Sequence, residues 1–521
     1  MRLSVYLFRE GAVDFDQLLR MKYRAGGDAF EIVEPAQQLS FECRALVQVS
    51  RAKEPKWKKF LEPTFDLHHL NLESKFNSFI LFIRAKDRVF GLTFGRGFHA
   101  IEAALVEPDF GLRVTLNDID PGLLDTMDTR NIDLVTRQRR THMNTGSPLF
   151  AFGVSPDADW IRMVSGVPRF DTFAKRLAGA DGLQITLDCD LPALHEKCER
   201  LLELFLSEDY KKSFAFIDNL RPVKDKDPIL RSLDQELARM LQSAPSDQLA
   251  LAHPELPENA IESYRIFSGR YEGFFDHLHI SEIFKFLNDN PGADRDPNSI
   301  FLVGLDSGKA AVTPKNKLKL YLVAQLQRAP KTYVLSLGHW FRVDTTYLET
   351  LRRRVSEIPD LTKKLHLPAM LRGEDEVMYN RRVASLHKWV NLDRSKFNFK
   401  TRHDQIEVCD LLTSKREFIC VKKMESSATL SHLFAQASVS ATLFNRLEPY
   451  RTKIRKSYEA QWPKKNFDDA APITFVYAIV TDKTGSLADD LFFFSLVNLL
   501  PHVETIRSAG FKVALCKIDA P

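Results

Sequence analysis

Residues 406–423, IEVCDLLTSKREFICVKK, contain two apolar runs that alternate with period 2 around a short charged turn. This pattern predicts two adjacent β-strands, because successive side chains of a strand point to opposite faces of a sheet. Asp410 interrupts the first run, and Lys422 and Lys423 end the second. A charge among apolar neighbours costs free energy unless it is paired, so an acid and a lysine in this hairpin require a chemical or a structural reason.

The hairpin predicts where these groups point. If Asp410 lies opposite Cys420, a turn through residues 414–416 closes the hairpin. Asp410, Cys420 and Lys422 then share one face of the sheet, because residues i and i+2 of a strand lie on the same side. A helix is predicted at 428–444, a strand at 472–481, a largely helical segment at 492–510 and a final strand at 511–518. The order β-β-α-β-α-β indicates a mixed sheet flanked by helices.

The chain has 521 residues, which is too long for one hydrophobic core. We predict a multi-domain α/β (mixed α+β) protein. Its predicted parts are a mixed α/β domain at 1–150, a mainly helical segment at 151–260, a β-rich region at 261–375 and the C-terminal α/β domain at 376–521. Other predicted elements are a strand at 2–8, a helix at 14–23, a hairpin at 76–95 turning at Lys86 and Asp87, helices at 191–206, 227–242 and 344–358, and antiparallel strands within 263–343.

Basic residues gather around the C-terminal helix. Residues 381–465 contain 18 Lys or Arg and 8 Asp or Glu, a net charge of +10, whereas the whole chain carries +4. Basic groups neutralise phosphates and aromatic rings stack on bases, so this tract predicts a nucleic-acid partner, with DNA favoured over RNA. The alternative is an ordinary solvated basic surface. The candidate nucleic-acid-binding residues are Arg381, Arg382, Lys388, Trp389, Arg394, Lys396, Lys400, Arg451, Lys453, Arg455 and Lys456.

The C-terminal part resembles the core of PD-(D/E)xK nucleases, with an acid at the end of one strand, a short turn, an apolar strand ending in lysine, and a following helix. The resemblance implies a restriction-endonuclease-like core. It also implies that Asp410 binds a metal, that Lys422 is the catalytic lysine, and that Gln436 supports the site. The acid expected two residues before the lysine is replaced by Cys420. Mg²⁺ prefers oxygen ligands to a thiol, so another carboxylate must substitute, and Glu425 is the candidate.

His432 and Gln436 lie four residues apart and so share a helix face, from which they could position a water molecule or a phosphate. His432 as a packed core residue is the alternative. For Asp410 and Lys422, the alternative is an ion pair at the end of a hairpin.

A second basic cluster, Arg137, Arg139 and Arg140 with Arg130 before it, suits phosphate recognition but also fits a solvated helix face. The six cysteines form no CxxC pair, which argues against the usual zinc sites and a disulfide framework. The apolar runs are too short for a signal peptide or a membrane span. We therefore expect a cytoplasmic protein with no membrane partner.

The whole chain also resembles a group of sporadically distributed bacterial proteins of unknown function, through DFGLRVTLNDIDP, DNLRPVKD and the segment from IEVCDLL to SHLFAQ. Such a distribution is typical of mobile defence cargo.

Three functional hypotheses follow. The first is a nuclease-like, Mg²⁺- or Mn²⁺-dependent nucleic-acid phosphodiesterase in bacterial anti-phage or restriction defence. The second is a non-catalytic nucleic-acid-binding or scaffold protein with a degenerate nuclease-like domain. The third is a phosphate-directed enzyme or toxin that uses the arginine cluster near 137–140.

Overall fold

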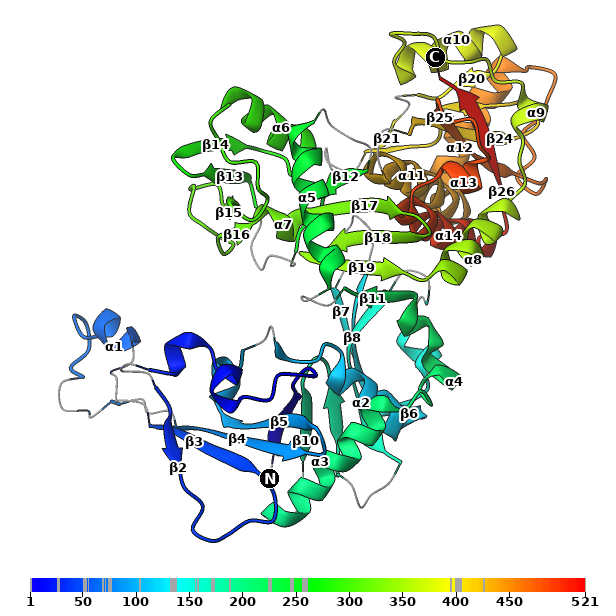
Figure 1. Ribbon diagram of the computed structural model, residues 1–521. Helices are drawn as coiled ribbons and strands as arrows, with labels where there is room; N and C mark the ends of the chain where they lie inside the picture. The colour runs from blue at the N-terminus through cyan, green and yellow to red at the C-terminus, as the bar shows by residue number, and fades with distance from the viewer. Residues whose placement is uncertain are drawn as a thin grey trace. The chain divides into compact units, whose positions relative to one another are not determined.

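The structure is a computed structural model of the chain, and it shows a mixed α/β, multi-domain protein (Figure 1). It describes residues 2–520 except 26–28, 50–53, 55, 68–69, 71, 74–76, 103–104, 132–137, 155, 157–158, 170–173, 187–188, 224–226, 244–247, 255–260, 394–395, 399–404 and 425–426. The chain divides into two compact units, one of residues 1–130 and 138–217 and one of residues 131–137 and 218–521. The predicted boundary at residue 150 falls inside the first unit, and those at 260 and 375 fall inside the second.

The first unit is built on a ten-stranded sheet. Its spatial order is β2 (Glu31–Val33), β3 (Cys43–Val49), β4 (Asn77–Ala85), β5 (Arg88–Gly95), β1 (Arg2–Leu7), β10 (Leu183–Thr186), β9 (Leu177–Gly179), β8 (Asp159–Pro168), β6 (Ile119–Asn131) and β7 (Gln138–Ser147). The predicted strand at 2–8 and the hairpin at 76–95 are confirmed, and Lys86 takes the positive φ of 55° that the tight turn requires. The helical elements are η1 (Phe15–Leu18), η2 (Met21–Tyr23), α1 (Lys56–Leu61), η3 (Gly97–Ala100), α2 (Phe110–Asp118), η5 (Leu149–Phe152), α3 (Leu191–Leu206) and α4 (Lys211–Phe214). The 3-10 helix η6 (Ala215–Asn219) spans the boundary between the two units.

Helix α3 packs on one face of this sheet. Asp190 caps its N-terminus by accepting a hydrogen bond from the Ala193 amide, as expected of an N-cap residue. Leu194, Cys198 and Leu201 recur at helical spacing and bury against strands β1, β4, β5 and β10. Helix α2 approaches strand β9 so closely that a Cβ atom on Gly179 would lie 1.9 Å from the Gly111 carbonyl oxygen.

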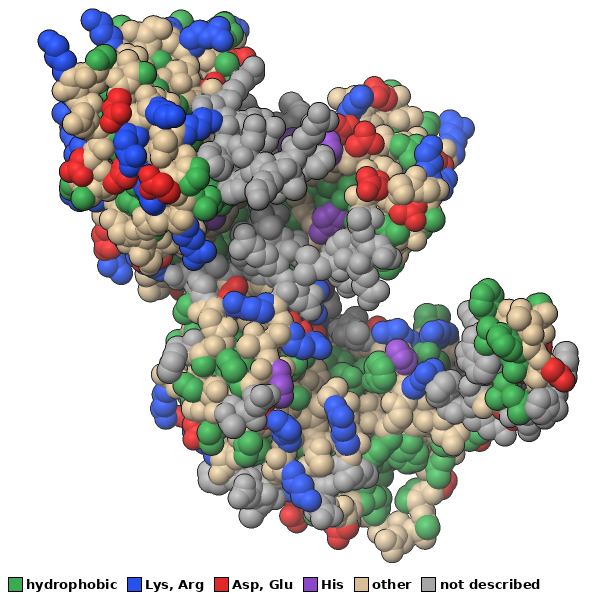
Figure 2. All heavy atoms as spheres, turned by 180° about the vertical axis from the view of Figure 1, so that it is seen from behind, with side chains coloured by type: hydrophobic (Ala, Val, Ile, Leu, Met, Phe, Trp, Pro, Cys, Tyr) green, Lys and Arg blue, Asp and Glu red, His purple; other side chains and the backbone are tan. Residues whose placement is uncertain are grey.

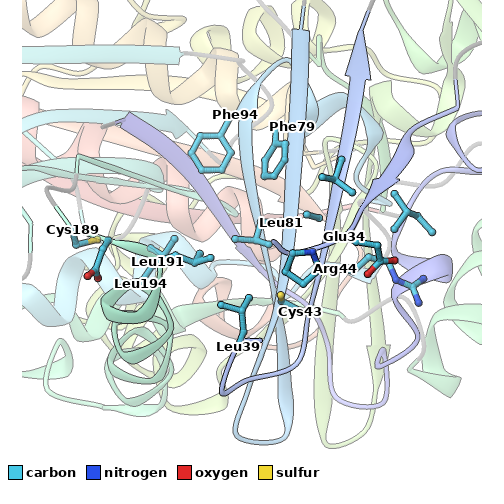
Figure 3. Close-up of a pocket in the computed structure, with 15 residues that line it drawn as sticks. Glu34, Leu39, Cys43, Arg44, Phe79, Leu81, Phe94, Cys189, Leu191 and Leu194 are labelled. Carbon is cyan, nitrogen blue, oxygen red and sulfur yellow. The ribbon is translucent and has the colours of Figure 1, made fainter. Parts of the chain in front are cut away.

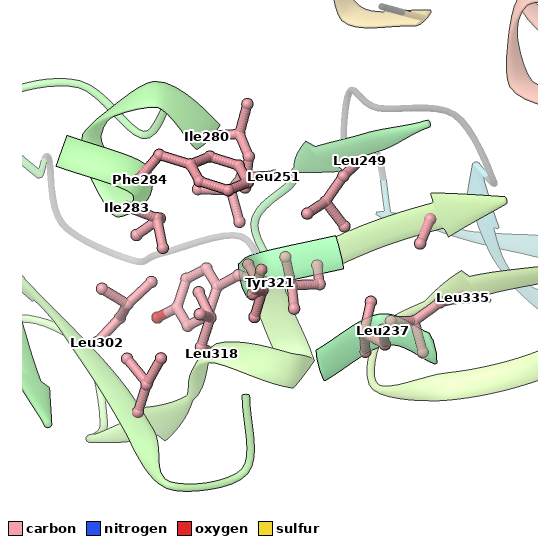
Figure 4. Close-up of a cluster of buried hydrophobic side chains, with 14 of the residues drawn as sticks. Leu237, Leu249, Leu251, Ile280, Ile283, Phe284, Leu302, Leu318, Tyr321 and Leu335 are labelled. Atoms are coloured by element: carbon pink, nitrogen blue, oxygen red, sulfur yellow. The ribbon is translucent and has the colours of Figure 1, made fainter. Parts of the chain in front are cut away.

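The second unit begins with two antiparallel sheets and the helices that cover them. One sheet has the order β11 (Leu220–Pro222), β19 (His339–Val343), β18 (Lys331–Ser336), β17 (Leu322–Arg328) and β12 (Leu249–Leu251); the other has β14 (Tyr271–Phe275), β13 (Ser263–Ser268), β15 (Ile300–Leu305) and β16 (Asn316–Lys317). The helices are α5 (Pro228–Gln242), α6 (Ile280–Asp289), α7 (Leu318–Tyr321), α8 (Thr345–Ser356) and α9 (Thr362–Leu365). Leu237, Phe284 and Tyr321 belong to one closed apolar core shared by these elements (Figure 4).

The C-terminal part contains the mixed sheet β20 (Val390–Asn391), β23 (Leu411–Leu412), β24 (Glu417–Lys423), β25 (Thr474–Thr481) and β26 (Lys512–Asp519). β20, β23 and β24 pair antiparallel, whereas β24, β25 and β26 run parallel. The flanking elements are α10 (Glu376–His387), β21 (Lys396–Asn398), β22 (Gln405–Glu407), α11 (Ser427–Arg446), α12 (Glu448–Gln461), α13 (Leu487–Asp490) and α14 (Phe493–Ser508). From β23 to β26 the predicted order of strands and helices is confirmed, with α12 and α13 in addition.

Helices cover both faces of this sheet. Val383 of α10 packs in one core with Ile419 and Val421 of β24. On the other face, the ring of Phe444 of α11 meets that of Phe418 at a centroid distance of 6.0 Å. Strand alternation explains the division, because residues 419 and 421 point to one face and residues 418 and 420 to the other.

Three sequence predictions differ from the fold. Residues 14–23 form two 3-10 turns instead of one helix. Strands β8 to β10 occupy much of the first part of 151–260, which was predicted to be mainly helical. The run at 406–413 is split, because residues 405–407 pair with β21 in a separate two-stranded sheet and only Leu411 and Leu412 pair with β24.

Candidate functional site at the end of strand β24

The hairpin has the predicted register. Leu411 pairs with Ile419 and Leu412 with Phe418, which sets Asp410 beside Cys420. The Asp410 amide donates to the Ile419 carbonyl oxygen over 2.9 Å. The turn passes through residues 414–416, and Arg416 has a positive φ of 62°.

Asp410 is 7 % exposed, and its carboxylate accepts a hydrogen bond from the backbone. Its Oδ2 accepts a hydrogen bond of 2.6 Å from the backbone amide of Val421. Val421 lies beyond Ile419, the last residue of β24 that pairs with β23. The Asp410 side chain therefore provides the acceptor that a backbone carbonyl of a neighbouring strand would otherwise provide. The carboxylate thereby continues the β24 hydrogen-bonding edge.

A second carboxylate, Glu376, meets the same strand. Its Oε1 accepts a 3.1 Å hydrogen bond from the Lys423 amide. Its Oε2 lies 2.7 Å from Lys422 Nζ in an ion pair whose two side chains are 27 % and 31 % exposed, so solvent reaches both. Glu376 is the first residue of α10, after the N-cap Asp375. A carboxylate is favoured there by the positive end of the helix dipole.

The two carboxylates must lie near one another. The amides of residues i and i+2 point to the same edge of a strand and are separated by about 6.6 Å, twice the rise per residue. Asp410 accepts from residue 421 and Glu376 from residue 423, so the carboxylates occupy consecutive positions along one edge. Lys422 lies between these two residues in the sequence and is bound to Glu376. The strand end therefore unites two acids and one accessible ammonium group.

The segment before α10 is hydrogen-bonded to the same end of β24. Lys423 Nζ donates to the Glu374 carbonyl oxygen over 3.0 Å. The Glu374 side chain is 7 % exposed and holds Arg382 through hydrogen bonds of 2.7 and 2.8 Å. These hydrogen bonds from Arg382 lower the pKa of Glu374. Glu374 and Arg382 thus support the position of Glu376 without contributing a free charge.

The cysteines of the hairpin are unsuited to metal binding. Cys420 is 0 % exposed, as is Cys409. Burial raises the pKa of the Cys409 thiol well above its ordinary value, which keeps the thiol protonated. Among the described residues, no group of three or more His, Cys, Asp or Glu side chains is arranged around a common metal position. Among the described residues, Asp410 and Glu376 are the carboxylates whose oxygens meet the β24 amides.

The predicted supporting residues of α11 have different surroundings. Gln436 is partly buried, and its Nε2 atom is buried without a hydrogen-bond partner among the described residues. His432 is exposed, because the buried stripe of the helix runs through Leu430, Leu433 and Phe434. The idea that His432 faces the sheet together with Gln436 is therefore corrected. Glu425, the predicted second metal ligand, lies outside the described residues.

Several predicted nucleic-acid contacts are already engaged in ion pairs. Arg382 binds Glu374, Arg451 binds Glu448, and Arg455 binds Asp469. Trp389 stacks on His387 with ring centroids 4.5 Å apart and packs against the α10 core. On the described part of the face in Figure 2, Lys and Arg side chains are interspersed with Asp and Glu. The predicted basic surface is thus partly neutralised.

The other predicted basic contacts fall into three groups. Arg381, Lys388 and Lys456 are exposed, and Lys453 is partly buried. Arg394 and Lys400 lie outside the described residues. Lys396 is placed by its backbone in β21.

The N-terminal arginine cluster is on strands, which corrects the predicted helix face. Arg130 is the penultimate residue of β6 and is 8 % exposed, whereas Arg139 and Arg140 belong to β7. Arg139 pairs with Asp159 at 3.1 Å and Arg140 with Asp128 at 2.8 Å. Arg137 lies outside the described residues. The two described β7 arginines are therefore paired with acids of the same unit.

Glu376 is the site residue that sequence reasoning missed. It lies 34 residues before Asp410 in the sequence, and no hairpin pattern connects the two. The available signal was the sequence DEVMYN, in which Asp375 caps a helix and places an acid in its first turn. That signal predicts a helix start but not which strand the helix start will meet.

The fold and this strand end define a multi-domain mixed α/β protein with paired carboxylates and a lysine at a sheet edge. The chain belongs to the family of unknown function DUF6119, whose model matches residues 3–519. No curated protein and no solved structure matches the chain. No helix in the described part of the chain is both long enough and apolar enough to cross a bilayer.

Proposed function

We propose that the protein is a metal-dependent nucleic-acid phosphodiesterase whose site comprises Asp410, Glu376 and Lys422. The observation that carries the proposal is the capping of the Val421 and Lys423 amides at the end of β24 by two carboxylates, the buried Asp410 and the partly exposed Glu376. Glu376 then supplies the second acid that the sequence lacks at position 420. The order α10, β20, β23, β24, α11, β25 also supports a restriction-endonuclease-like core.

The donor set fits Mg²⁺ or Mn²⁺. Such ions are commonly held by one or two carboxylates and complete their coordination with water and phosphate oxygens. When bound, the ion would supply a polarised water and offset negative charge on the phosphate. The Asp410 carboxylate is held in place by its hydrogen bond from the Val421 amide, so its orientation is fixed before an ion binds. Lys422 would orient the attacking water and stabilise the charge that develops on the phosphate.

The cleavage test uses conservative variants of the full chain. Asp410→Asn and Glu376→Gln each keep an acceptor for the β24 amides but remove a metal-binding charge. Glu448→Gln is the matched control, because Glu448 is an acid in an exposed ion pair of α12. Plasmid, single-stranded DNA and RNA are incubated with Mg²⁺, Mn²⁺ or EDTA. Cleavage should require the metal and be lost in Asp410→Asn, Glu376→Gln and Lys422→Ala but not in Glu448→Gln.

Two results would overturn the catalytic proposal. One is cleavage that persists in folded Asp410→Asn. The other is the lack of cleavage of all three polymers with either metal, while the protein still binds them. A cytoplasmic role in anti-phage defence is tested separately by phage plating on cells that express the wild-type or the Asp410→Asn protein.

A non-catalytic nucleic-acid-binding protein is the second candidate. It is favoured by the ion pair between Glu376 and Lys422, which occupies both groups with each other. A protein of this kind would retain DNA without cleaving it, and retention would fall steeply with salt concentration. Arg381→Ala and Lys456→Ala, at exposed positions, should weaken that retention.

A further inference from the structure

A second feature lies in the N-terminal unit, on the sheet face that α3 covers. Strand pairing sets Val33, Ala45 and Leu81 in one row across β2, β3 and β4. Phe79 and Phe94 form part of the next row, with ring centroids 5.8 Å apart. Leu194 of α3 is buried with Leu81, whereas Ala45, Phe79 and Phe94 are only partly buried at the margin of that core. The helix therefore covers one part of an apolar face and leaves the part toward β2 open.

A cavity of about 500 Å³ lies at this margin (Figure 3). Its floor is the sheet face of β3, β4 and β5, and one side is the first turn of α3, with Leu191 and Leu194. The loop that contains Glu34 and Leu39 forms another side. This volume and an apolar lining with few polar groups are typical of small-molecule sites. The cavity thus has the size and the surface of a site for an apolar molecule.

The charges around the cavity favour a cation. Three ionisable side chains other than thiols line it: Glu34, Asp190 and Arg44. Arg44 is engaged by Asp16 in an ion pair and stacks at 5.4 Å over Phe15, on the opposite face of β3. Asp190 caps α3, whose positive end offsets its charge. Glu34, which is exposed, is therefore the carboxylate best placed to meet a cationic group.

We propose that this cavity binds a small molecule with an apolar body and an amine group, the apolar body on Ala45, Phe79 and Phe94 and the ammonium at Glu34. The proposal is independent of the phosphodiesterase site, which lies in the other unit. A bound amine would bury apolar surface that the fold leaves open, and this burial drives the binding.

The chain provides its own reporters of binding. Of its six cysteines, Cys198, Cys409, Cys420 and Cys516 are buried, whereas Cys43 and Cys189 are partly exposed. Both partly exposed cysteines line the cavity. Maleimide labelling of the native protein, read by mass spectrometry at each cysteine, therefore reports on the cavity. Burial raises the pKa of Cys43, so labelling is best measured at mildly alkaline pH.

The probes share a twelve-carbon chain and differ in the head group: dodecylamine, 1-dodecanol and dodecanoate. The two ionic probes are used below their micelle concentrations and dodecanol below its solubility limit. At ten times its dissociation constant, dodecylamine should slow labelling of Cys43 and Cys189 about tenfold, because about one molecule in eleven is free. Dodecanol should bind more weakly and dodecanoate most weakly.

Two variants separate the apolar and the ionic contributions. Ala45→Phe fills the cavity and should abolish protection of Cys189, provided that thermal unfolding shows a folded protein. Glu34→Gln should remove the preference for dodecylamine over dodecanol. Glu31→Gln is its matched control, because Glu31 is an exposed acid of β2, three residues before Glu34, and does not line the cavity.

The proposal fails if none of the three probes protects the thiols, or if protection survives in folded Ala45→Phe. It also fails if dodecanoate protects as well as dodecylamine, since the head-group assignment would then be wrong. Loss of the preference in Glu31→Gln as well as in Glu34→Gln would show a general charge effect and would equally contradict the assignment.

Discussion

Two buried aspartates, Asp410 of the second unit and Asp118 of the first, have opposite surroundings. Asp410 of the second unit is 7 % exposed and accepts a 2.6 Å hydrogen bond from a backbone amide. Asp118, the last residue of α2 in the first unit, is 1 % exposed, and its Oδ2 has no hydrogen-bond partner among the described residues. Burial raises the pKa of Asp118 despite the opposing charges of Arg200 and Arg169. The role of a buried acid can therefore be inferred only when its hydrogen-bond donors are considered with it.

The Asp410 carboxylate is held by a hydrogen-bond donor, whereas the buried Oδ2 of Asp118 has no such donor among the described residues. The Val421 amide donor fixes the direction of the Asp410 carboxylate. Without a donor, a buried carboxylate is destabilised in its charged form. We therefore expect Asp410 to contribute to chemistry and to stability, and Asp118 to cost stability at neutral pH.

The largest expected effect is on catalysis. Asp410→Asn should lower metal-dependent cleavage at least about a hundredfold, the usual scale for loss of a catalytic group. The free energy of unfolding should change little, because the amide oxygen of asparagine can still accept from Val421. Initial cleavage rates and urea unfolding measured on the same preparation check both parts. The corresponding Asp118→Asn protein is the control, and its cleavage rate should be that of the wild type.

The next effect is on stability. Asp410→Ala leaves the Val421 amide without an acceptor and should lower the free energy of unfolding by about 1–3 kcal/mol. Urea denaturation, with Asp410→Asn alongside, measures the difference. If both variants had the same stability, the hydrogen bond between Asp410 and Val421 would contribute nothing, and the comparison with Asp118 would lose its basis.

A pH effect distinguishes Asp118. Its pKa is higher in the folded than in the unfolded protein, so its contribution favours folding at low pH and is lost as the pH rises through the folded-state value. Asp118→Asn removes this dependence. The stability of the variant relative to the wild type should therefore increase between pH 4 and pH 8, by on the order of 1 kcal/mol. A flat or falling difference in urea unfolding across that range would contradict the assignment.

The smallest effect is expected for an exposed acid. Glu448 is 58 % exposed and pairs with Arg451. Glu448→Gln should leave the free energy of unfolding nearly unchanged, since exposed ion pairs contribute little. Raising the salt concentration should remove most of the difference. A larger loss would mean that α12 depends on this pair, and Glu448→Gln would no longer serve as a neutral control.

Elements that carry their own signals were predictable from the sequence. Helix α3 has a cap at Asp190 and apolar residues at helical spacing, and the hairpin around residues 414–416 has two alternating runs and a charged turn. Strand β7, QRRTHMNTGS, has almost no apolar alternation, so its strand conformation depends on pairing with β6. The same reason explains why the run at 406–413 is split between two sheets. Which strand each half pairs with depends on tertiary packing and not on the local sequence.

The candidate site was only half predictable. Asp410 and Lys422 lie in one hairpin, where spacing alone relates them. Glu376 reaches them because α10 folds back across β24, and no local pattern records that packing. The uncovered face beside α3 was equally hidden, because it depends on how far the helix extends over a sheet formed by strands distant in the sequence.

The position of β1 has a consequence for how the N-terminal sheet assembles. This strand pairs with β5 on one side and with β10 on the other. During synthesis, Leu3, Val5 and Leu7 must wait for partners that emerge roughly ninety and one hundred and eighty residues later, at a ribosomal rate of about 5–20 residues per second. Until both partner strands have been synthesised, the apolar side chains of this segment cannot be buried in the native sheet.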